Sequence, residues 1–431
     1  MTSVLFACEY YPPFAPGGAE WTTEAWAGAL ARRGHAITVV TPNYGAPARE
    51  RRDGVSIIRI PFPVRLSPGQ GEVRGIFHRN PLFYLYFGWQ IHRAARAAGA
   101  ALIHAQGKAA LPAAVLAGGA LGTPVVVTIR DLGLACPLGL CSLFEDWTTL
   151  DCSTRQYLGR CVPFHLRHYH AGSGVFHRAR VQAASLWAWW DVKLRQMALR
   201  HARIILGVSH GVLAVYPERL VPRRKTRIVH SLPPPRQGLP SDEEVQAARR
   251  SLGVGAAPLV LYAGKLSLGK GATVFLESLD GVRTAVPGVR FVMAGKGEVR
   301  VPSSPDLHVL GSIPQERLFA LYRAADVIVV PSMWPEPLSR VLLEAMRFSR
   351  PVVATAVGGT PEVVEHGVTG LLVPKRDPEA LAKAVSELLL DPARRAAMGR
   401  AAAQRADVLF NEEALVGELL GIYSSVLGES P

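Results

Sequence analysis

The sequence lacks both a segment typical of secretion and an apolar run pure enough to cross a membrane. Residues 1–8 contain no basic stretch, and their short apolar run ends at Glu9. One uncharged stretch, residues 111–129, contains two prolines and three glycines, so we interpret it as a helix, a turn and a buried strand. We therefore expect a cytoplasmic protein that touches a membrane, if at all, peripherally and at its inner face.

Acidic residues are scarce in the first half of the chain. Residues 1–230 hold 27 Lys or Arg and 12 Asp or Glu, whereas residues 231–431 hold 21 and 22, so the net charge of +14 comes from the first half. Such asymmetry indicates an anionic partner of that half: an anionic membrane surface, a phosphorylated lipid carrier or a nucleic acid. The length of 431 residues, with 49% hydrophobic and 19% charged residues, is typical of a folded chain with more than one core.

Cysteine is also rare, and four of the five cysteines lie close together. Cys8 falls in a predicted buried strand, where it acts as a small hydrophobic residue. The other four fall within 26 residues: Cys136, Cys141, Cys152 and Cys161. Their spacing allows a structural zinc or iron–sulfur cluster, unpaired thiols or disulfides. A metal held by four thiolates would be structural, because it leaves no open coordination position.

Short apolar segments rich in β-branched residues alternate with helix-length segments along almost the whole chain. Continuous apolar runs of this length are typical of parallel strands buried on both faces. We predict strands at residues 4–7, 37–41, 55–60, 102–104, 125–129 and 204–208, and, after a proline-rich segment, at 259–263, 291–294, 308–311, 327–330, 351–355 and 370–373. An amphipathic helix over residues 18–33 joins the first two strands into a βαβ unit.

Two such series predict an α/β fold of two Rossmann-like, doubly wound domains. We place the domains at residues 1–230 and 231–410, with the proline-rich residues 232–240 as a stiff linker between the two series. Open parallel sheets bind ligands at the carboxyl ends of their strands, so we expect a site in a cleft between the domains. An insertion spans about residues 132–202. Its residues 162–202 are predicted to be helical and basic, with three tryptophans, and form either an interfacial helix on a membrane or an ordinary amphipathic helix.

The strongest chemical pattern lies in residues 331–374, where two glutamates are eight positions apart. Glu336 precedes a helix predicted to begin near Ser339, and Glu344 lies inside that helix. The start of a helix offers unpaired N–H groups and a partial positive charge. The N–H groups of Leu338 and Ser339 can therefore bind phosphate oxygens or sugar hydroxyls.

Glycine-containing turns follow four of the predicted strands. Glycine lets the backbone approach a ligand closely, and a helix that begins in such a turn favours anions. The glycines are Gly17 and Gly18 (with Glu20), Gly264, Gly295, and Gly358 with Gly359. Two cations, Lys265 and Lys270, lie in the turn that Gly264 opens.

Residues 331–374 resemble the C-terminal domain of the retaining GT-B glycosyltransferases of family 4. That family has two glutamates separated by seven residues, followed by a P-V-V-A-T…G-G-x-P-E-V-V stretch similar to the one found here. The resemblance implies that Glu344 binds the nucleotide ribose and that Glu336, with the amides after it, holds the donor sugar. The segment GKLSLGKG is similar to the G-R-L-x-x-x-K-G motif with which the family binds the donor diphosphate. Lys265 stands where the motif has arginine, and Lys270 matches the lysine of the motif.

The resemblance extends to the first domain, with departures. Gly17, Gly18 and Glu20 match the G-G-x-E loop of the family, whose N–H groups meet the donor phosphate or the acceptor. After the strand 125–129 the family usually has histidine and aspartate, where this sequence has Arg130 and Asp131. Since arginine cannot act as a general base, Asp131 is carried over and Arg130 is a site residue without an assigned role.

The resemblance implies transfer of a sugar, with retention, from a nucleoside-diphosphate sugar. The catalytic candidates are Glu336, Lys270, Lys265, Arg130 and Asp131, and no cofactor or divalent ion is required. The acceptor is expected to be a glycan, polysaccharide or lipid-linked group bound by the basic first domain, not a nucleic acid. A last helix, residues 411–431, is expected to cross back to that domain. A GT-B nucleotide-sugar epimerase or phosphorylase and a non-catalytic nucleotide-sugar-binding scaffold remain alternatives.

Overall fold

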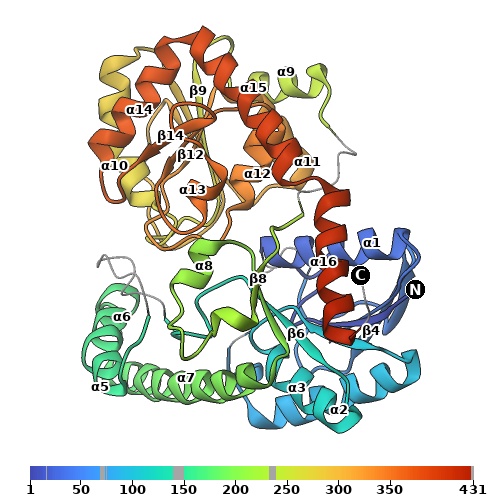
Figure 1. Cartoon of the computed structure of the whole chain (residues 1–431). Helices are drawn as coiled ribbons and strands as arrows, with labels where there is room; N and C mark the ends of the chain where they lie inside the picture. Colours follow the sequence, from blue (N-terminus) through green and yellow to red (C-terminus); the bar gives the residue numbers. More distant parts are fainter. Residues whose placement is uncertain (16, 68–72, 74, 139–149, 233–238, 429–431) are drawn as a thin grey trace. The chain divides into compact units, whose positions relative to one another are not determined.

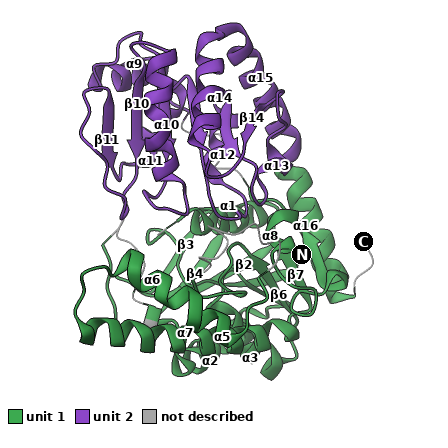
Figure 2. Cartoon of the chain, turned by 90° about the vertical axis from the view of Figure 1, so that its left-hand side faces the viewer, with its two compact units in different colours: residues 1–232, 412–431 green, residues 233–411 purple. Residues whose placement is uncertain are grey.

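The structure, a computed structural model, divides into two compact units (Figures 1 and 2). It describes residues 1–428 apart from residues 16, 68–72, 74, 139–149 and 233–238. Unit 1 comprises Met1–Leu232 and Glu412–Pro431, and unit 2 comprises Pro233–Asn411. Most of the predicted linker and Cys141 lie outside the described residues.

In the described part of the chain, the strands form an eight-stranded sheet in unit 1 and a six-stranded sheet in unit 2. The strands of unit 1 are β1 (Ser3–Ala7), β2 (Ala36–Pro42), β3 (Arg49–Arg52), β4 (Val55–Ile60), β5 (Leu102–Ala105), β6 (Val125–Ile129), β7 (Ile204–Gly207) and β8 (Thr226–Ile228). Those of unit 2 are β9 (Leu259–Ala263), β10 (Arg290–Ala294), β11 (Leu307–Gly311), β12 (Val327–Val330), β13 (Val352–Thr355) and β14 (Gly370–Val373).

The helices surround these two sheets. In unit 1 they are α1 (Gly18–Arg32), α2 (Pro81–Ala98), α3 (Ala110–Leu121), α5 (Thr154–Gln156), α6 (Val162–Tyr169), α7 (Val175–His201), α8 (His210–Ala214) and α16 (Glu412–Leu427), with short turns η1 (Gly75–Phe77), η2 (Tyr157–Cys161) and η3 (Arg223–Lys225). In unit 2 they are α9 (Asp242–Ser251), α10 (Ala272–Ala285), α11 (Gln315–Ala324), α12 (Arg340–Arg347), α13 (Thr360–Val363), α14 (Pro378–Leu390) and α15 (Pro392–Leu409). Among the described residues, no helix has the length and apolar character needed to span a bilayer.

Unit 1 is a doubly wound sheet with strand order β3-β4-β2-β1-β5-β6-β7-β8. Its paired strands are parallel except for the edge pair β3 and β4, and Phe6 at the centre pairs with Val39 and His104 on either side. Helices α2, α3 and α7 lie on one face of the sheet, and α1, which contacts α16, lies on the other (Figures 1 and 2). The winding reverses at β1, which is where open sheets of this kind bind ligands.

Unit 2 repeats this plan with strand order β11-β10-β9-β12-β13-β14, parallel throughout. The winding reverses at β9, which is flanked by β10 and β12. Leu261, Val292, Ile328 and Val352, from four neighbouring strands, form one buried core with Tyr322 of α11. Such apolar strands are stable only when helices cover both faces of their sheet, which explains the continuous apolar runs in the sequence.

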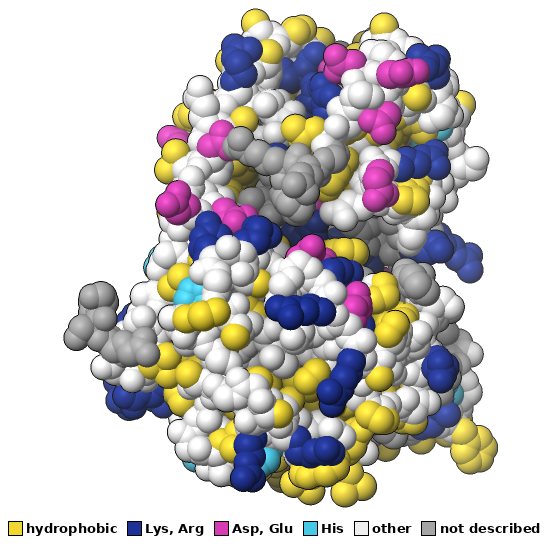
Figure 3. Space-filling view, turned by 90° about the vertical axis from the view of Figure 1, so that its right-hand side faces the viewer, with side chains coloured by type: hydrophobic (Ala, Val, Ile, Leu, Met, Phe, Trp, Pro, Cys, Tyr) yellow, Lys and Arg dark blue, Asp and Glu magenta, His cyan; other side chains and the backbone are white. Residues whose placement is uncertain are grey.

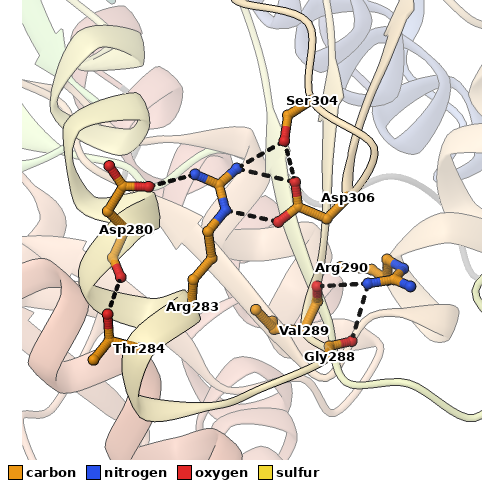
Figure 4. Close-up of polar contacts among 8 residues, drawn as sticks. All are labelled: Asp280, Arg283, Thr284, Gly288, Val289, Arg290, Ser304 and Asp306. Atoms are coloured by element: carbon orange, nitrogen blue, oxygen red, sulfur yellow. Dashed lines mark hydrogen bonds and ion pairs between the residues drawn. The ribbon is translucent and has the colours of Figure 1, made fainter.

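An arginine joins α10 to the start of β11 in unit 2. Arg283 donates from Nε and Nη2 to the two carboxylate oxygens of Asp306, at 2.7 and 3.0 Å, and from Nη1 to Asp280 at 2.6 Å (Figure 4). The hydrogen bonds from Arg283 lower the pKa of Asp306 to about 2. Because Asp306 directly precedes β11, this bidentate pair stabilises the amino edge of the sheet, opposite the edge expected to bind ligand.

The predicted fold of two doubly wound α/β domains is confirmed, and each predicted strand agrees with the structure to within one residue at either end. Two strands were not predicted. One is β3, whose sequence is RERR, and the other is the three-residue β8. Both lie at a sheet edge exposed to solvent, where no continuous apolar run is needed.

The helix α16 completes unit 1 through a buried hydrogen bond. Tyr423 Oη lies 2.7 Å from His104 Nδ1, and His104 Nε2 lies 2.7 Å from Thr128 Oγ1. Burial lowers the pKa of His104 to about 3, so its imidazole is neutral at physiological pH. At the surface, Arg32 of α1 pairs with Glu412 at the start of α16, at 2.8 Å.

We expect Tyr423→Ala to destabilise unit 1 by about 3–5 kcal/mol, because it leaves a cavity and an unsatisfied histidine. Tyr423→Phe keeps the ring and should cost about 1–3 kcal/mol. Urea unfolding followed by tryptophan fluorescence reports on unit 1, since seven of the eight tryptophans lie there. Ser425→Ala, at an exposed position of the same helix, is the control. An unchanged midpoint for Tyr423→Ala would show that α16 contributes nothing to the stability of unit 1.

Candidate functional site

The residues predicted for the second domain lie mainly in turns at the carboxyl ends of four strands. Gly264 and Lys265 follow β9, and Gly295 follows β10. The loop that carries Glu336 follows β12, and Gly358 follows β13. Since these strands are parallel, the structure brings the turns together along one edge of the sheet of unit 2.

The centre of this edge is an ion pair between the partly exposed Lys270 and the buried Glu336. Lys270 Nζ lies 2.8 and 2.7 Å from the two carboxylate oxygens of Glu336, whose side chain is 6% exposed. Ser332 Oγ and Trp334 Nε1 also donate to this carboxylate, at 3.0 and 2.9 Å. Burial raises the pKa of Glu336, but Lys270 and these hydrogen bonds outweigh it and hold the pKa below its usual value. The Glu336 side chain is therefore an ionised carboxylate at neutral pH.

Glycines allow backbone to pack against backbone around Glu336. A Cβ atom at Gly358 (φ 54°) would lie 2.1 Å from the carbonyl oxygen of Glu336, and the Gly359 N–H donates to that oxygen at 2.8 Å. At Gly271 (φ 70°) a Cβ atom would lie 1.7 Å from the carbonyl oxygen of Pro331. No other residue fits these two turns without moving the backbone, so they fix the loop that carries Glu336.

The second glutamate of the pattern is held within its own helix. Helix α12 begins after Ser339, as predicted, with Leu338 in the preceding turn. Glu344 is 4% exposed, and Arg340, one turn earlier, approaches its Oε1 with both Nε and Nη2 at 3.0 Å. Burial and the Glu344 carboxylate raise the pKa of Tyr322 well above its usual value, so that phenol stays protonated. A buried carboxylate oriented in this way can accept hydrogen bonds from a pair of hydroxyls.

The remaining turns of this edge differ in exposure. A Cβ atom at Gly295 (φ 151°) would lie 1.8 Å from the carbonyl oxygen of Gly264, whose own N–H donates to Ala294 at 2.9 Å. Lys265 is exposed beside them. The two lysines of the motif are thus unlike: Lys270 is engaged by Glu336, whereas Lys265 extends into solvent.

In unit 1 a polar cavity of about 150 Å³ lies at the carboxyl ends of β1, β5 and β6. It brings together the predicted residues Glu20, Arg130 and Asp131. The other charged or hydrogen-bonding side chains that line it are Glu9, Tyr10, Thr23, His78, Arg79, Gln106, Lys108, Thr128 and Arg195. A larger hollow of about 650 Å³ lies at the amino ends of β6 and β7 and contains none of the predicted residues.

Arg130 connects α1, which begins at Gly18, to the turn after β5. Its Nη1 donates to the Ala19 carbonyl at 2.8 Å and to Thr23 Oγ1 at 2.6 Å, and its Nη2 donates to Gln106 Oε1 at 2.6 Å. Burial lowers the pKa of Arg130 to about 10, which still leaves the guanidinium charged at neutral pH. Arg130 therefore positions the start of α1, in addition to lining the cavity.

The two predicted carboxyl groups of this cavity differ in electrostatic state. Lys108 Nζ lies 2.7 Å from Asp131 Oδ2, and the Gly133 N–H donates to Oδ1 at 2.7 Å. Burial raises the pKa of Asp131, but Lys108 and the Gly133 N–H hold it below its usual value. Burial raises the pKa of Glu20, although its Oε2 accepts a hydrogen bond from the Gly17 N–H at 3.0 Å. Of these two carboxyl groups, Asp131 therefore has the lower pKa relative to its usual value and is the more stable as an anion.

The metal site predicted from the cysteines is not supported. Cys136 and Cys161 are buried, Cys152 is partly exposed, and Cys141 lies outside the described residues. Across the part of the chain that the structure describes, no three His, Cys, Asp or Glu side chains converge as metal ligands do. Cys136 follows β6 and Cys161 belongs to η2, and burial, with help from both thiols, raises the pKa of Tyr157.

Some side chains that line the cavity or hold the predicted residues had no motif to identify them. Glu9 and Lys108 follow the ends of β1 and β5, so the rule that ligands bind at carboxyl ends of strands could have found them. Arg340 precedes Glu344 by four residues, a spacing at which charges pair along a helix. The hydrogen bond of Trp334 had no such signal, because it depends on the path of an irregular loop.

Two family sequence models match the chain. The one described as "Glycosyltransferase Family 4" matches residues 16–231, and the one described as "Glycosyl transferases group 1" matches residues 257–391. Each match covers the sheet of one unit in large part, and the two doubly wound units are those of a GT-B glycosyltransferase. The chain belongs to glycosyltransferase family 4.

Curated relatives match part of the chain. One is the D-inositol 3-phosphate glycosyltransferase of Corynebacterium aurimucosum, 34% identical over 204 residues, which are 43% of this chain and 48% of the relative. Another is the alpha-D-kanosaminyltransferase of Streptomyces kanamyceticus, 32% identical over 203 residues, which are 43% and 51%. The chain spans about half the length of the curated relatives it matches.

Solved structures share the fold over the whole chain. The sucrose-phosphate synthase of Thermosynechococcus elongatus matches with a TM-score of 0.71 and 21% identity over 100% of both chains. Anabaena Alr3699/HepE in complex with UDP-glucose matches with a TM-score of 0.68 and 20% identity, over 99% of this chain and 100% of that one. At these identities the likeness concerns the fold, and it confirms the GT-B architecture.

We expect Gly271→Ala to destabilise unit 2 by at least about 2 kcal/mol more than Gly253→Ala does. Both glycines have left-handed backbone, with φ of 70° and 63°, so both variants carry the same conformational strain of about 1 kcal/mol. Only at position 271 would the new Cβ atom collide with Pro331, since nothing lies within 4 Å of it at position 253. Thermal unfolding measures the difference, and equal midpoints would contradict the close packing of this turn.

Lys270→Met should reverse the pH dependence that Glu336 contributes to stability. In the wild type the pKa of Glu336 is lowered, so its contribution is present above the usual carboxyl pKa and disappears as the pH falls through the lowered value. Without Lys270, burial raises the pKa of Glu336, and stability should fall as the pH rises toward neutral, by about 1–3 kcal/mol.

Thermal midpoints between about pH 4 and 8 test this expectation. The double variant Lys270→Met with Glu336→Gln should lose the dependence, and Lys265→Met, which removes the exposed cation of the same turn, should keep the wild-type profile. A Lys270→Met profile parallel to that of the wild type would mean that Lys270 does not hold Glu336 in its charged form.

Proposed function

We propose that this chain is a glycosyltransferase that moves a sugar from a nucleoside-diphosphate sugar to an acceptor hydroxyl. The observation that carries the proposal is the ion pair of Lys270 with the buried Glu336, among glycine turns at the carboxyl edge of unit 2. Membership of family 4 supports it, as do the transferase names of the curated relatives. Alr3699/HepE, which has the same fold, was solved with UDP-glucose.

In this proposal unit 2 binds the donor. Lys270, assisted by Lys265, stabilises the negative charge that develops on the leaving diphosphate. Glu336 orients Lys270 and accepts hydrogen bonds from the donor sugar, whose other hydroxyls meet the N–H groups of Leu338 and Ser339. The tight turns at Gly264, Gly295, Gly358 and Gly359 bring further backbone close to the donor. Glu344, held by Arg340, accepts hydrogen bonds from the ribose hydroxyls.

The transfer proceeds with retention and without a divalent metal in this proposal. The bond between the anomeric carbon and the leaving phosphate breaks, and the acceptor oxygen bonds to the same face of the sugar. The acceptor proton passes to an oxygen of the leaving diphosphate. The two lysines supply the positive charge that a metal ion supplies in other transferases, which is why no ion is required.

Unit 1 binds the acceptor in this proposal. Its cavity contains the ionised carboxylate of Asp131 and cationic groups that include Lys108 and Arg130. It can therefore bind an acceptor that carries both hydroxyls and negative charge. The excess of Lys and Arg in the first half of the chain favours a lipid-linked or polysaccharide acceptor and peripheral contact with an anionic membrane. Glu20, in the first turn of α1, lines this cavity, and its carboxylate accepts a hydrogen bond from the Gly17 N–H.

One observation favours a second candidate, a scaffold that binds nucleotide sugar without turnover. Arg130 occupies the position at which family 4 usually has histidine, and its guanidinium is engaged by Ala19, Thr23 and Gln106. A side chain committed to holding α1 is not available for proton transfer. Release of nucleotide from the donor distinguishes the scaffold from the transferase.

We expect the wild type to release nucleoside diphosphate slowly from one member of a panel of UDP-, GDP- and ADP-sugars, equally with and without a metal chelator. Lys270→Ala should lower the rate constant by about 100-fold or more, because it removes charge stabilisation in the transition state. Glu344→Gln should mainly raise KM, because it weakens nucleotide binding. Glu277→Gln, an exposed glutamate on α10, is the matched control.

The other outcomes separate the alternatives. Nucleotide binding without release supports the scaffold, interconversion of the sugar supports an epimerase, and a requirement for free phosphate supports a phosphorylase. When an acceptor is supplied, nuclear magnetic resonance of the anomeric proton in the product tests retention. Inversion would remove that part of the proposal, and full activity of Lys270→Ala would remove the assigned chemistry.

A further inference from the structure

Unit 1 presents an apolar helical surface that the described residues leave open to solvent. Helices α2, α3 and α7 form one layer on its sheet (Figure 1). On the outside of this layer lie Leu82, Leu85 and Trp89 of α2 and Trp190, Leu194 and Met197 of α7. Leu82 is 72% exposed, Trp89 51% and Trp190 61%. We call this surface, defined by these six residues and the cations beside them, the α2–α7 face.

Buried contacts fix the two helices of the α2–α7 face to each other. Asp191 and Arg195 of α7 form an ion pair at 2.6 Å with both side chains 2% exposed, and Tyr84 of α2 hydrogen-bonds to both. Trp187 Nε1 donates to the Arg79 carbonyl, just before α2 begins, at 2.5 Å. The exposed apolar groups therefore lie on two helices that are joined by buried contacts and that both pack against α3.

The α2–α7 face carries positive charge and no exposed acid. Helices α2 and α3 contain no Asp or Glu, and the one acidic residue of α7 is the buried Asp191. Arg93 and Arg96 on α2 and Arg200 on α7 are exposed, and Arg93 Cζ lies 4.8 Å above the ring of Trp89. Figure 3 views the molecule from the right-hand side of Figure 1 and shows hydrophobic side chains beside Lys and Arg along the lower margin of unit 1.

The surface of unit 2 offers a contrast. Its large exposed apolar residues, among those described, include Leu390 and Val408, and none is aromatic. The acidic and basic residues of the second half of the chain are nearly balanced. The combination of exposed tryptophan, leucine and arginine without acid thus belongs to one face of one unit, which argues against ordinary surface variation.

We propose that the α2–α7 face binds the surface of a bilayer that contains anionic lipids. Tryptophan and leucine enter the boundary between headgroups and acyl chains, and arginine beside them pairs with lipid phosphates. A second copy of the chain is a poor occupant, because two cationic faces repel each other. The proposal rests on the proposed function only in that a lipid-linked acceptor would be found at such a surface; vesicle binding itself needs no sugar transfer.

The test is co-sedimentation with vesicles of equal parts phosphatidylglycerol and phosphatidylcholine, compared with vesicles of phosphatidylcholine alone. The wild type should bind the anionic vesicles, and high salt should weaken the binding. Both an apolar variant (Leu82→Ser, Trp89→Ser and Trp190→Ser) and a charge variant (Arg93→Gln and Arg96→Gln) should lower the partition coefficient at least about tenfold. Leu390→Ser with Val408→Ser, equally exposed in unit 2, is the matched control and should bind as the wild type does.

Three results would overturn the proposal: no binding to anionic vesicles, binding that the control lowers as much as the face variants do, and a dimer that only the face variants dissociate. The last would assign the face to a second copy. All substituted side chains are exposed, so circular dichroism and thermal midpoints should match the wild type. Nucleotide release in the absence of vesicles should also be unchanged, so that failure of vesicle binding and failure of the proposed transfer are separate results.

Discussion

The contact on which the carboxyl edge of unit 2 depends is the ion pair between Lys270 and Glu336. A carboxylate this buried is stable only with a cation and hydrogen-bond donors around it, and the structure supplies both from two different turns. The turn of Lys270 reaches Glu336 because Gly271 lets it press against the backbone of Pro331. The loop of Glu336 is in turn held by Gly358 from the next strand. The charge pair and the glycines therefore require one another.

In unit 1 the charged side chains gather around a cavity. Four cations line this cavity, and Asp131 stays ionised because Lys108 and the Gly133 N–H offset its partial desolvation. Arg130, at a position where family 4 usually has histidine, has a structural role, because its guanidinium joins the first turn of α1 to the turn after β5. Charge in this unit thus serves both to shape a binding cavity and to fasten the helix that borders it.

The sequence was sufficient for the parts of the fold whose signal is local. Strands buried on both faces must be continuously apolar, so β9 and β12 could be placed to the residue, whereas the exposed edge strand β3 could not. Likewise, Glu336 and Glu344 were marked by a spacing, and the helix start at Ser339 by its place between them. The partners of these groups depend on long-range packing of irregular turns, which leaves no periodic trace. The metal suggested by the cysteine spacing is not supported, because no three potential ligands converge among the described residues.

The return of α16 to unit 1 has a consequence for how the chain is made. Unit 1 is encoded by both ends of the described chain, whereas unit 2 is one continuous segment between them. During synthesis on the ribosome, the whole of Pro233–Asn411 must emerge before Tyr423 can meet His104. At about 5–20 residues per second, that leaves the side of α1 that α16 covers exposed for roughly ten seconds or more. Unit 1 is therefore the first unit to begin folding and the last to finish. Until α16 is made, the uncovered side of α1 is the surface of unit 1 that a chaperone would bind.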